Sequence, residues 1–163
     1  MNALVIVILV GALAAALGLT AAGFRPAPRL AEFCPDRTAT PRVFVDTADH
    51  VHAAYLAAAA RTPGMVIAEQ GPRLLYLDSR PTARVLAGDF GVALLVRFAD
   101  QTTGGTVVTV DAQAKMWAPT RAATLTELER ALRMRAKTTG ITELIHHRPK
   151  DSGGAQPATR HTN

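Results

Sequence analysis

The feature that most constrains this chain is an uncharged, apolar run near its amino end, from Ala3 to Gly23. The run carries one hydroxyl group, on Thr20. At about 1.5 Å per residue, a helix of this length extends roughly 30 Å, which matches the hydrocarbon core of a bilayer. The run therefore predicts a transmembrane anchor over residues 1–24, with the lipid bilayer as a partner.

The residues that flank this run favour an anchor over a secretory signal. Only Met1 and Asn2 precede it, so the positive charge that begins a typical signal peptide is missing, and the run is longer than a usual signal core. Cleavage near Ala22, followed by secretion, is the alternative. Four arginines follow the run closely, which by the positive-inside rule predicts a single-pass cell-membrane protein with its domain on the cytoplasmic side. These are Arg25, Arg29, Arg37 and Arg42.

Small residues recur at helical spacing inside the predicted anchor. A stripe of small side chains lets a second helix approach closely. We therefore interpret the stripe as a possible contact with another membrane protein, or with a second copy of this chain; an alanine-rich composition is the simpler alternative. The residues concerned are Gly11, Ala14, Gly18 and Ala22.

The remaining chain divides into three parts by composition. Pro26 and Pro28 disfavour a helix and predict an extended juxtamembrane linker over residues 25–41. Residues 42–141 are enough for one small domain with one core. Residues 142–163 are polar and predict a disordered tail. The sole cysteine, Cys34, cannot form an internal disulfide.

Within residues 42–141, the apolar patterns predict an α+β fold. A strand over 42–46 leads into a helix over 48–60, for which Asp46 or Thr47 is the predicted cap. Strands follow, and the last helix is predicted to begin at a capping box, Thr124 to Glu127. We thus expect a small antiparallel sheet of four to six strands packed against a long carboxyl-terminal helix and one shorter helix. The predicted later strands are 65–69, 73–78, 83–87, 90–99 and 106–116.

Two of these strands alternate strictly between apolar and mixed positions. Val92, Leu94 and Val96 share one face of the first, and Val108 and Val110 share one face of the second. Such alternation is typical of an antiparallel sheet with one dry and one wetter face. The last helix carries an apolar stripe that would cover the dry face. The stripe consists of Leu125, Leu128, Leu132 and Ala136.

Few side chains offer catalytic chemistry. The only serines are Ser79, in a predicted turn, and Ser152, in the predicted tail, and Cys34 lies outside the domain. A nucleophile in a formed pocket is therefore hard to build. The chain has no phosphate-binding glycine loop and too few cysteines for a zinc site. We expect no catalytic residue, no metal, no cofactor and no enzymatic activity; an enzyme that uses an Asp46–His50 pair is a remote alternative.

One face of the last helix is basic. Arg130, Arg133 and Lys137 lie on it, and Glu129 can pair with Arg133 four residues later. A solvated helix face is the simple interpretation, and contact with anionic lipid headgroups or an acidic partner is the functional one. Nucleic acid is not an expected partner, because the aromatic residues are too sparse to stack on bases.

The element order resembles that of a known fold. Residues 43–49 lead from a strand into a helix, further strands follow, and a long helix closes the domain, as in a reduced helix-grip domain of the START-like and polyketide-cyclase-like superfamily. This resemblance implies a hydrophobic ligand held between sheet and helix; the alternative is that the same side chains simply form the core. The cavity residues it implies are Leu94, Val96, Val108, Val110, Leu128 and Leu132.

Together these patterns predict a membrane-anchored protein whose α+β domain is a non-enzymatic interaction or accessory module of a membrane complex. The alternative function is binding of a lipid or another hydrophobic ligand at the membrane surface.

Overall fold

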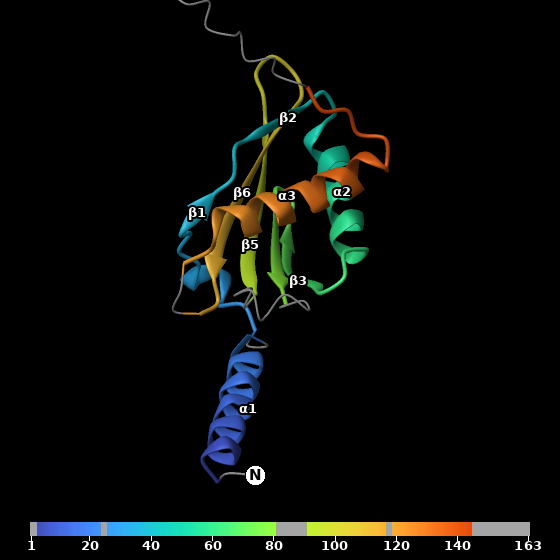
Figure 1. The fold of residues 1–163 in the computed structure, drawn as a ribbon. Helices are drawn as coiled ribbons and strands as arrows, with labels where there is room; N and C mark the ends of the chain where they lie inside the picture. Colours follow the sequence, from blue (N-terminus) through green and yellow to red (C-terminus); the bar gives the residue numbers. More distant parts are fainter. Residues whose placement is uncertain (1–2, 24–25, 81–90, 117–118, 145–163) are drawn as a thin grey trace, which may run out of the picture.

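A computed structural model describes residues 3–23, 26–80, 91–116 and 119–144 of the chain. Helix α1 comes first, and a short 3₁₀ helix, Leu30–Glu32, follows it. The remaining elements form one domain (Figure 1). They are β1 (Arg37–Thr38), β2 (Arg42–Phe44), α2 (Ala48–Ala60), β3 (Met65–Gly71), β4 (Leu74–Ser79), β5 (Val92–Asp100), β6 (Thr106–Ala114) and α3 (Ala122–Lys137), after α1 (Ala3–Gly23).

The described strands form one six-stranded sheet, and all of their pairings are antiparallel. The order is β1-β6-β5-β4-β3, and β2 pairs with β6 further along the same edge. Arg37 lies opposite Ala112, and Arg42 lies opposite Val108. The predicted α+β class and antiparallel sheet are confirmed. The strand predicted over 83–87 lies outside the described residues.

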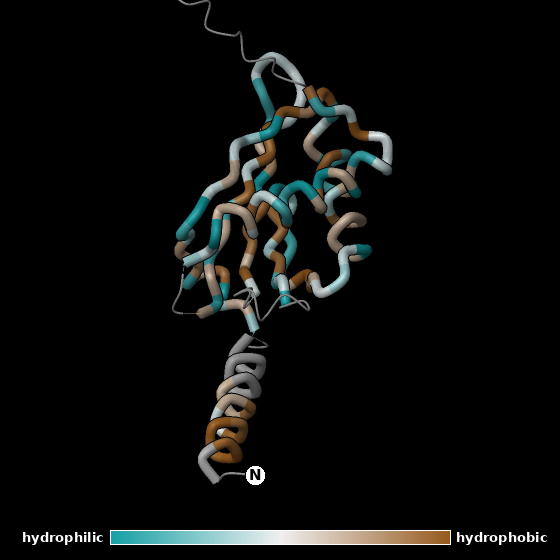
Figure 2. The backbone as a smooth tube through the Cα atoms, viewed as in Figure 1, coloured by the Kyte–Doolittle hydropathy of each residue, from teal (hydrophilic) through white to brown (hydrophobic). Residues whose placement is uncertain are grey.

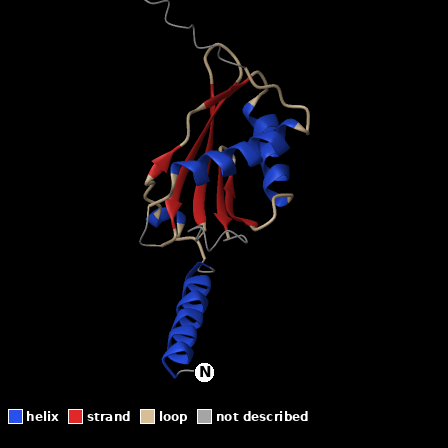
Figure 3. Cartoon of the chain, in the orientation of Figure 1, coloured by secondary structure: helices blue, strands red, loops and turns tan. Residues whose placement is uncertain are grey.

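Helices α2 and α3 cover one face of the sheet (Figure 3). The predicted alternation is confirmed, because Val92, Leu94, Val96 and Phe98 of β5 are all buried. Both helices pack against these β5 side chains. Helix α2 contributes Val51 and Tyr55, and α3 contributes its predicted apolar stripe. Hydropathy colouring shows this apolar layer inside the domain (Figure 2).

The opposite face of the sheet is partly covered by residues 26–36, which we call the strap. Tyr76 and Asp78 alternate along β4 with the core residues Leu75 and Leu77, so they point to the opposite face. The Tyr76 hydroxyl donates to the carbonyl of Pro28 at 2.8 Å, and Ala27 N–H donates to Asp78 Oδ2 at 3.3 Å. Part of the predicted linker therefore packs on the domain.

The helix boundaries agree with prediction in one case and differ in the other. Helix α2 covers the predicted residues 48–60, and Thr47 precedes it without a side-chain capping bond. The capping box at Thr124 is wrong: α3 begins at Ala122, so Thr124 already lies in the first turn. The two alanines ahead of Thr124, both strong helix formers, extend the helix toward its amino end.

Residues that the sequence predicts to be tail begin with an ordered segment beside β2. Val45 N–H donates to the Thr142 carbonyl at 3.0 Å, and Leu144 N–H donates to the Val43 carbonyl at 2.8 Å. Asp46 Oδ2 also accepts from Thr142 N–H at 2.7 Å. The domain therefore extends at least to residue 144.

Helix α1 projects from the domain beyond one end of the sheet (Figure 1). Its side chains are described over residues 5–15, and every one of them is exposed. This described part is too short to count as a membrane span, and no other described helix is both long and apolar enough to qualify. The predicted transmembrane anchor stays a prediction.

Candidate binding groove beside the strap

The candidate site begins with two polar side chains on β4. Because β4 alternates, Tyr76 and Asp78 leave the core face and meet the strap. The ring of Phe33, from the strap, packs edge-on against the ring of Tyr76, with centroids 5.5 Å apart. One aromatic contact and two hydrogen bonds thus hold the strap against this strand.

A buried ion pair lies next to these contacts. Lys115 Nζ is 2.6 Å from Asp78 Oδ1, and the lysine side chain is only 1% exposed. Asp78 uses its other oxygen for the strap, through Ala27 N–H. The carboxylate therefore connects the end of β6 to the start of the strap, and each of its oxygens has a partner.

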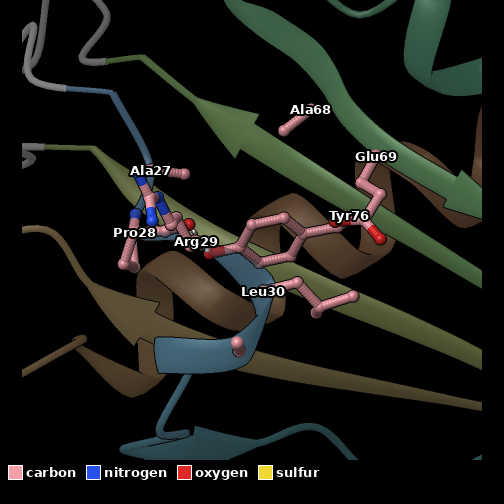
Figure 4. A pocket seen from close by; sticks show the side chains of 8 residues that line it. Ala27, Pro28, Arg29, Leu30, Ala68, Glu69 and Tyr76 are labelled. Atoms are coloured by element: carbon pink, nitrogen blue, oxygen red, sulfur yellow. Dashed lines mark hydrogen bonds between the residues drawn. The ribbon is translucent and has the colours of Figure 1, made fainter.

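Between the strap and the β3–β4 hairpin lies an open groove of about 680 Å³. Figure 4 shows the ring of Tyr76 between strap residues Ala27 to Leu30 on one side and Glu69 on the other. The walls are mostly apolar, and one guanidinium and one carboxylate are the charged groups. The lining residues are Ala27, Pro28, Arg29, Leu30, Ala31, Ala68, Glu69 and Tyr76.

The Tyr76 hydroxyl is a neutral donor at ordinary pH. Burial, with the nearby charges of Asp78 and Glu32, raises the pKa of Tyr76 to about 12. Its proton is already committed to the Pro28 carbonyl. The groove thus combines apolar walls, which give contact area, with a few polar groups, which can orient a ligand.

The cavity residues implied by the helix-grip resemblance lie elsewhere. Leu94, Val96, Val108, Val110 and Leu132 are buried in the core, and Leu128 packs against it half-buried. The structure thus brings these six residues together. None of them lines the strap groove or the second hollow described below.

The predicted helix-packing stripe is only partly described. Gly11 and Ala14 are exposed, and no atom outside the helix approaches Gly11 within 4 Å of where a Cβ would lie. Gly18 and Ala22 are in α1, but their surroundings lie outside the described residues. The stripe stays a prediction.

The predicted basic face of α3 is largely paired. Arg133 contacts Glu129 at 2.9 Å and Glu143 at 2.7 Å, and Lys137 reaches Glu143 at 3.4 Å. Burial alone would raise the pKa of the Glu143 carboxyl, but the hydrogen bond and charge of Arg133, helped by Lys137, hold that pKa below its ordinary value. Of the three predicted residues, Arg130 alone is fully exposed.

The remaining candidates are the Asp46–His50 pair and any cluster that could bind a metal ion. The predicted Asp46–His50 pair forms, with 3.1 Å between His50 Nδ1 and Asp46 Oδ1. Asp46 also binds the backbone of Thr142, which gives it a structural role. Within the part of the chain that is described, no cluster of His, Cys, Asp or Glu is arranged to hold a metal ion.

Sequence reasoning missed the residues that form the groove and the buried ion pair beside it, although the ion pair left signals in the sequence. Two signals were present: an aspartate, Asp78, at the end of an apolar strand, and a lysine, Lys115, near the end of another. Charged residues are unfavourable in strands unless they have partners. Comparison with known proteins adds no relative, since no protein-family model matches the chain and no curated protein matches it.

Proposed function

We propose that this protein is a single-pass membrane protein whose α+β domain is a non-enzymatic interaction module of a membrane complex. The observation that carries the proposal is the position of the groove. Ala27, the first groove residue, follows only four residues after Gly23, the last residue of α1. If α1 is inserted in a bilayer, the groove lies close to the membrane surface, where a membrane partner can reach it.

The exposed apolar side chains of α1 support membrane insertion. Val7, Ile8, Leu9 and Leu13 are each at least 60% exposed, although such side chains are ordinarily covered. A lipid environment or a partner helix would cover them. The stripe at Gly11 and Ala14 is the predicted place for a helix partner.

The strap supports a defined orientation of the domain. Its bonds to Tyr76 and Asp78 begin a few residues after α1, so little free chain separates the anchor from the domain. A partner in the same membrane would then meet the groove in a fixed geometry, which lowers the entropic cost of binding.

Crosslinking tests this function in the full chain. A photoreactive amino acid at Ala68, in the groove, is expected to capture a discrete membrane protein, whereas the same group at exposed Thr103 is not. Ala68→Trp should fill the groove and abolish co-purification of that partner, with Thr103→Trp as the matched control. Identical capture at the two positions, or a chain that purifies alone from native membranes, would contradict the proposal.

The cytoplasmic location of the domain is proposed from the arginines that follow α1. Fusion of alkaline phosphatase after Asn163 should give an inactive enzyme, and fusion of a fluorescent protein that matures only in the cytoplasm should give a bright one. The opposite pattern would place the domain on the other side.

Lipid binding is the second candidate function. It is favoured by the groove's volume of about 680 Å³ and its mainly apolar walls, and the helix-grip resemblance is its support from sequence. Mass spectrometry of the detergent-purified full chain should detect a retained lipid, and Ala68→Trp should remove it. Equal lipid retention by Ala68→Trp and Thr103→Trp would exclude the groove as the lipid site.

A further inference from the structure

A second hollow, of about 200 Å³, lies on the helix side of the domain. It is bounded by the chain segment that carries β1 and β2 and by the first two turns of α3. Its walls differ from those of the strap groove, because most of its lining side chains are polar or charged. They are Arg37, Thr38, Ala39, Thr40, Arg42, Ala122, Leu125, Thr126 and Glu129.

Arg42 is the least satisfied polar group in this hollow. Its Nε is buried and has no hydrogen-bond partner among the described residues. Arg42 forms two long ion pairs: Nε lies 3.6 Å from Glu129 Oε1 and Nη1 lies 3.7 Å from Glu143 Oε1, and neither distance is short enough for a hydrogen bond. A buried donor without an acceptor is costly, so the guanidinium is poised to bind an acceptor that enters the hollow.

The one carboxylate in the hollow is already neutralised. Glu129 Oε1 accepts a hydrogen bond from Arg133 Nε at 2.9 Å, and Arg133 also binds Glu143 at 2.7 Å. Arg42 pairs with the same two carboxylates at longer range than Arg133 does. With Arg37 on the same wall, the lining carries an excess of positive charge over the paired carboxylate.

The start of α3 adds hydrogen-bond donors to the same wall. Ala122, the first residue of α3, lines the hollow. Backbone N–H groups of a first helical turn lack partners inside the helix, and the helix dipole adds positive potential there. The exposed Thr40 adds a hydroxyl.

We propose that this hollow binds a small oxyanion of the phosphate class. The proposal is based on the Arg42 Nε, which has no hydrogen-bond partner among the described residues, and on the excess of positive charge in the lining. A guanidinium binds such an anion through two parallel N–H groups, which the fork of Arg42 can supply because its ion pairs are long. The anion would be either free phosphate or the phosphomonoester headgroup of a lipid. The proposal does not depend on the function proposed for the strap groove.

The test uses the full chain in an uncharged detergent. Inorganic phosphate is expected to raise the midpoint of thermal unfolding relative to chloride at equal ionic strength, since a ligand that binds only the folded state stabilises it. Arg42→Gln should weaken phosphate affinity about tenfold or more, as expected for loss of a charge-assisted hydrogen bond. Arg130→Gln, which alters an exposed arginine on the outer side of α3, should keep the affinity.

A second variant guards against a folding defect in Arg42→Gln. Thr40→Val removes only an exposed hydroxyl, so the domain should remain folded while phosphate affinity falls a few-fold. Nanodiscs with and without phosphatidic acid then separate the sources: stabilisation by free phosphate assigns the free anion, and stabilisation only by phosphatidic acid assigns the lipid. Phosphate and phosphatidic acid that do no more than chloride and neutral lipid would overturn the proposal, as would equal affinities in Arg42→Gln and Arg130→Gln.

Discussion

The two faces of the sheet are covered by opposite means, and two neighbouring residues of β4 show the contrast. Leu77 is fully buried on the helix face, where it lies in register with Leu94 of β5. Asp78 is buried on the strap face, where it binds Lys115 and the backbone of Ala27. One face excludes water with apolar side chains, and the other does so with paired charges and backbone hydrogen bonds.

The two faces therefore differ in how much their contacts depend on geometry. Apolar burial depends on area and tolerates small shifts of α2 and α3. The strap contacts need particular atoms at hydrogen-bond distance, and an unpaired group there costs more than the bond contributes. The helix face therefore supplies most of the folding stability, whereas the strap face fixes where the chain leading to α1 must lie.

The largest effect is expected from breaking the buried pair on the strap face. Lys115→Met leaves the Asp78 carboxylate without its cation in a buried place, which should cost about 3–5 kcal/mol of the free energy of unfolding. The double variant Asp78→Asn/Lys115→Met removes both charges and keeps an oxygen for Ala27 N–H, so it should recover part of that loss. Urea unfolding followed by circular dichroism measures both; a double variant no more stable than Lys115→Met would show that charge pairing is not the cause.

A neighbouring pair of leucines compares the two faces directly. Leu94 points into the helix face and is fully buried, whereas Leu95 points to the strap face and is half-buried. Leu94→Ala should destabilise by about 2–5 kcal/mol through lost burial and a residual cavity. Leu95→Ala should cost about 1 kcal/mol, since less apolar area leaves the protein interior. Equal losses in urea unfolding would mean that the strap face is packed as tightly as the helix face.

Sequence patterns predicted the helix face well, because the apolar residues that form it recur with the period of their strand or helix. The alternation of Val92 to Phe98 and the stripe from Leu125 to Ala136 each repeat with the period of their element, and the structure confirms both. The bounds of α2 also agree with the predicted helix over 48–60. The predicted start of α3 was wrong, because Ala122 and Ala123 extend the helix toward its amino end, ahead of Thr124.

The strap face could not be predicted in the same way. Its contacts join residues far apart in the sequence, and one partner is often a backbone group, as in Tyr76 to Pro28 and Gln113 to Cys34 N–H. Every residue has a backbone carbonyl, so the amino-acid sequence does not show which carbonyl accepts a given hydrogen bond. The groove beside Tyr76 follows from the strap's path and was therefore missed as well.

A matched pair of tyrosines, one on each face, tests how much the hydrogen bonds of the strap face contribute to stability. The Tyr76 hydroxyl donates to Pro28 on the strap face, whereas the Tyr55 hydroxyl is buried on the helix face with no hydrogen-bond partner in the described structure. Tyr76→Phe should cost about 0.5–1.5 kcal/mol and speed hydrogen exchange in the strap. Tyr55→Phe should be neutral or slightly stabilising, because it removes an unsatisfied group. If hydrogen exchange in the strap became faster in both variants, the hydrogen bond from Tyr76 to Pro28 would not be the specific contact that holds the strap.

A further effect is a loss of stability in alkaline solution, to which one buried tyrosine on each face contributes. Burial, reinforced by Glu129, raises the pKa of Tyr55 far above its ordinary value, and burial with Asp78 raises that of Tyr76 to about 12. An unfolded tyrosine ionises near pH 10, so above about that pH the unfolded state loses protons that the folded state keeps. The contribution of both phenols to stability is thus fully present below about pH 10 and declines as pH rises.

Urea midpoints measured from about pH 9 to 11 should fall for the native chain and fall less for Tyr55→Phe and Tyr76→Phe. The two variants should remove similar parts of the decline, because the folded pKa of each tyrosine lies above this pH range. Tyrosinate absorbance in the folded protein gives an independent readout, since neither phenol should ionise near pH 10 while the domain stays folded. Ionisation of Tyr76 at its ordinary pKa would mean that the strap opens readily and that the strap face is held far more weakly than the helix face.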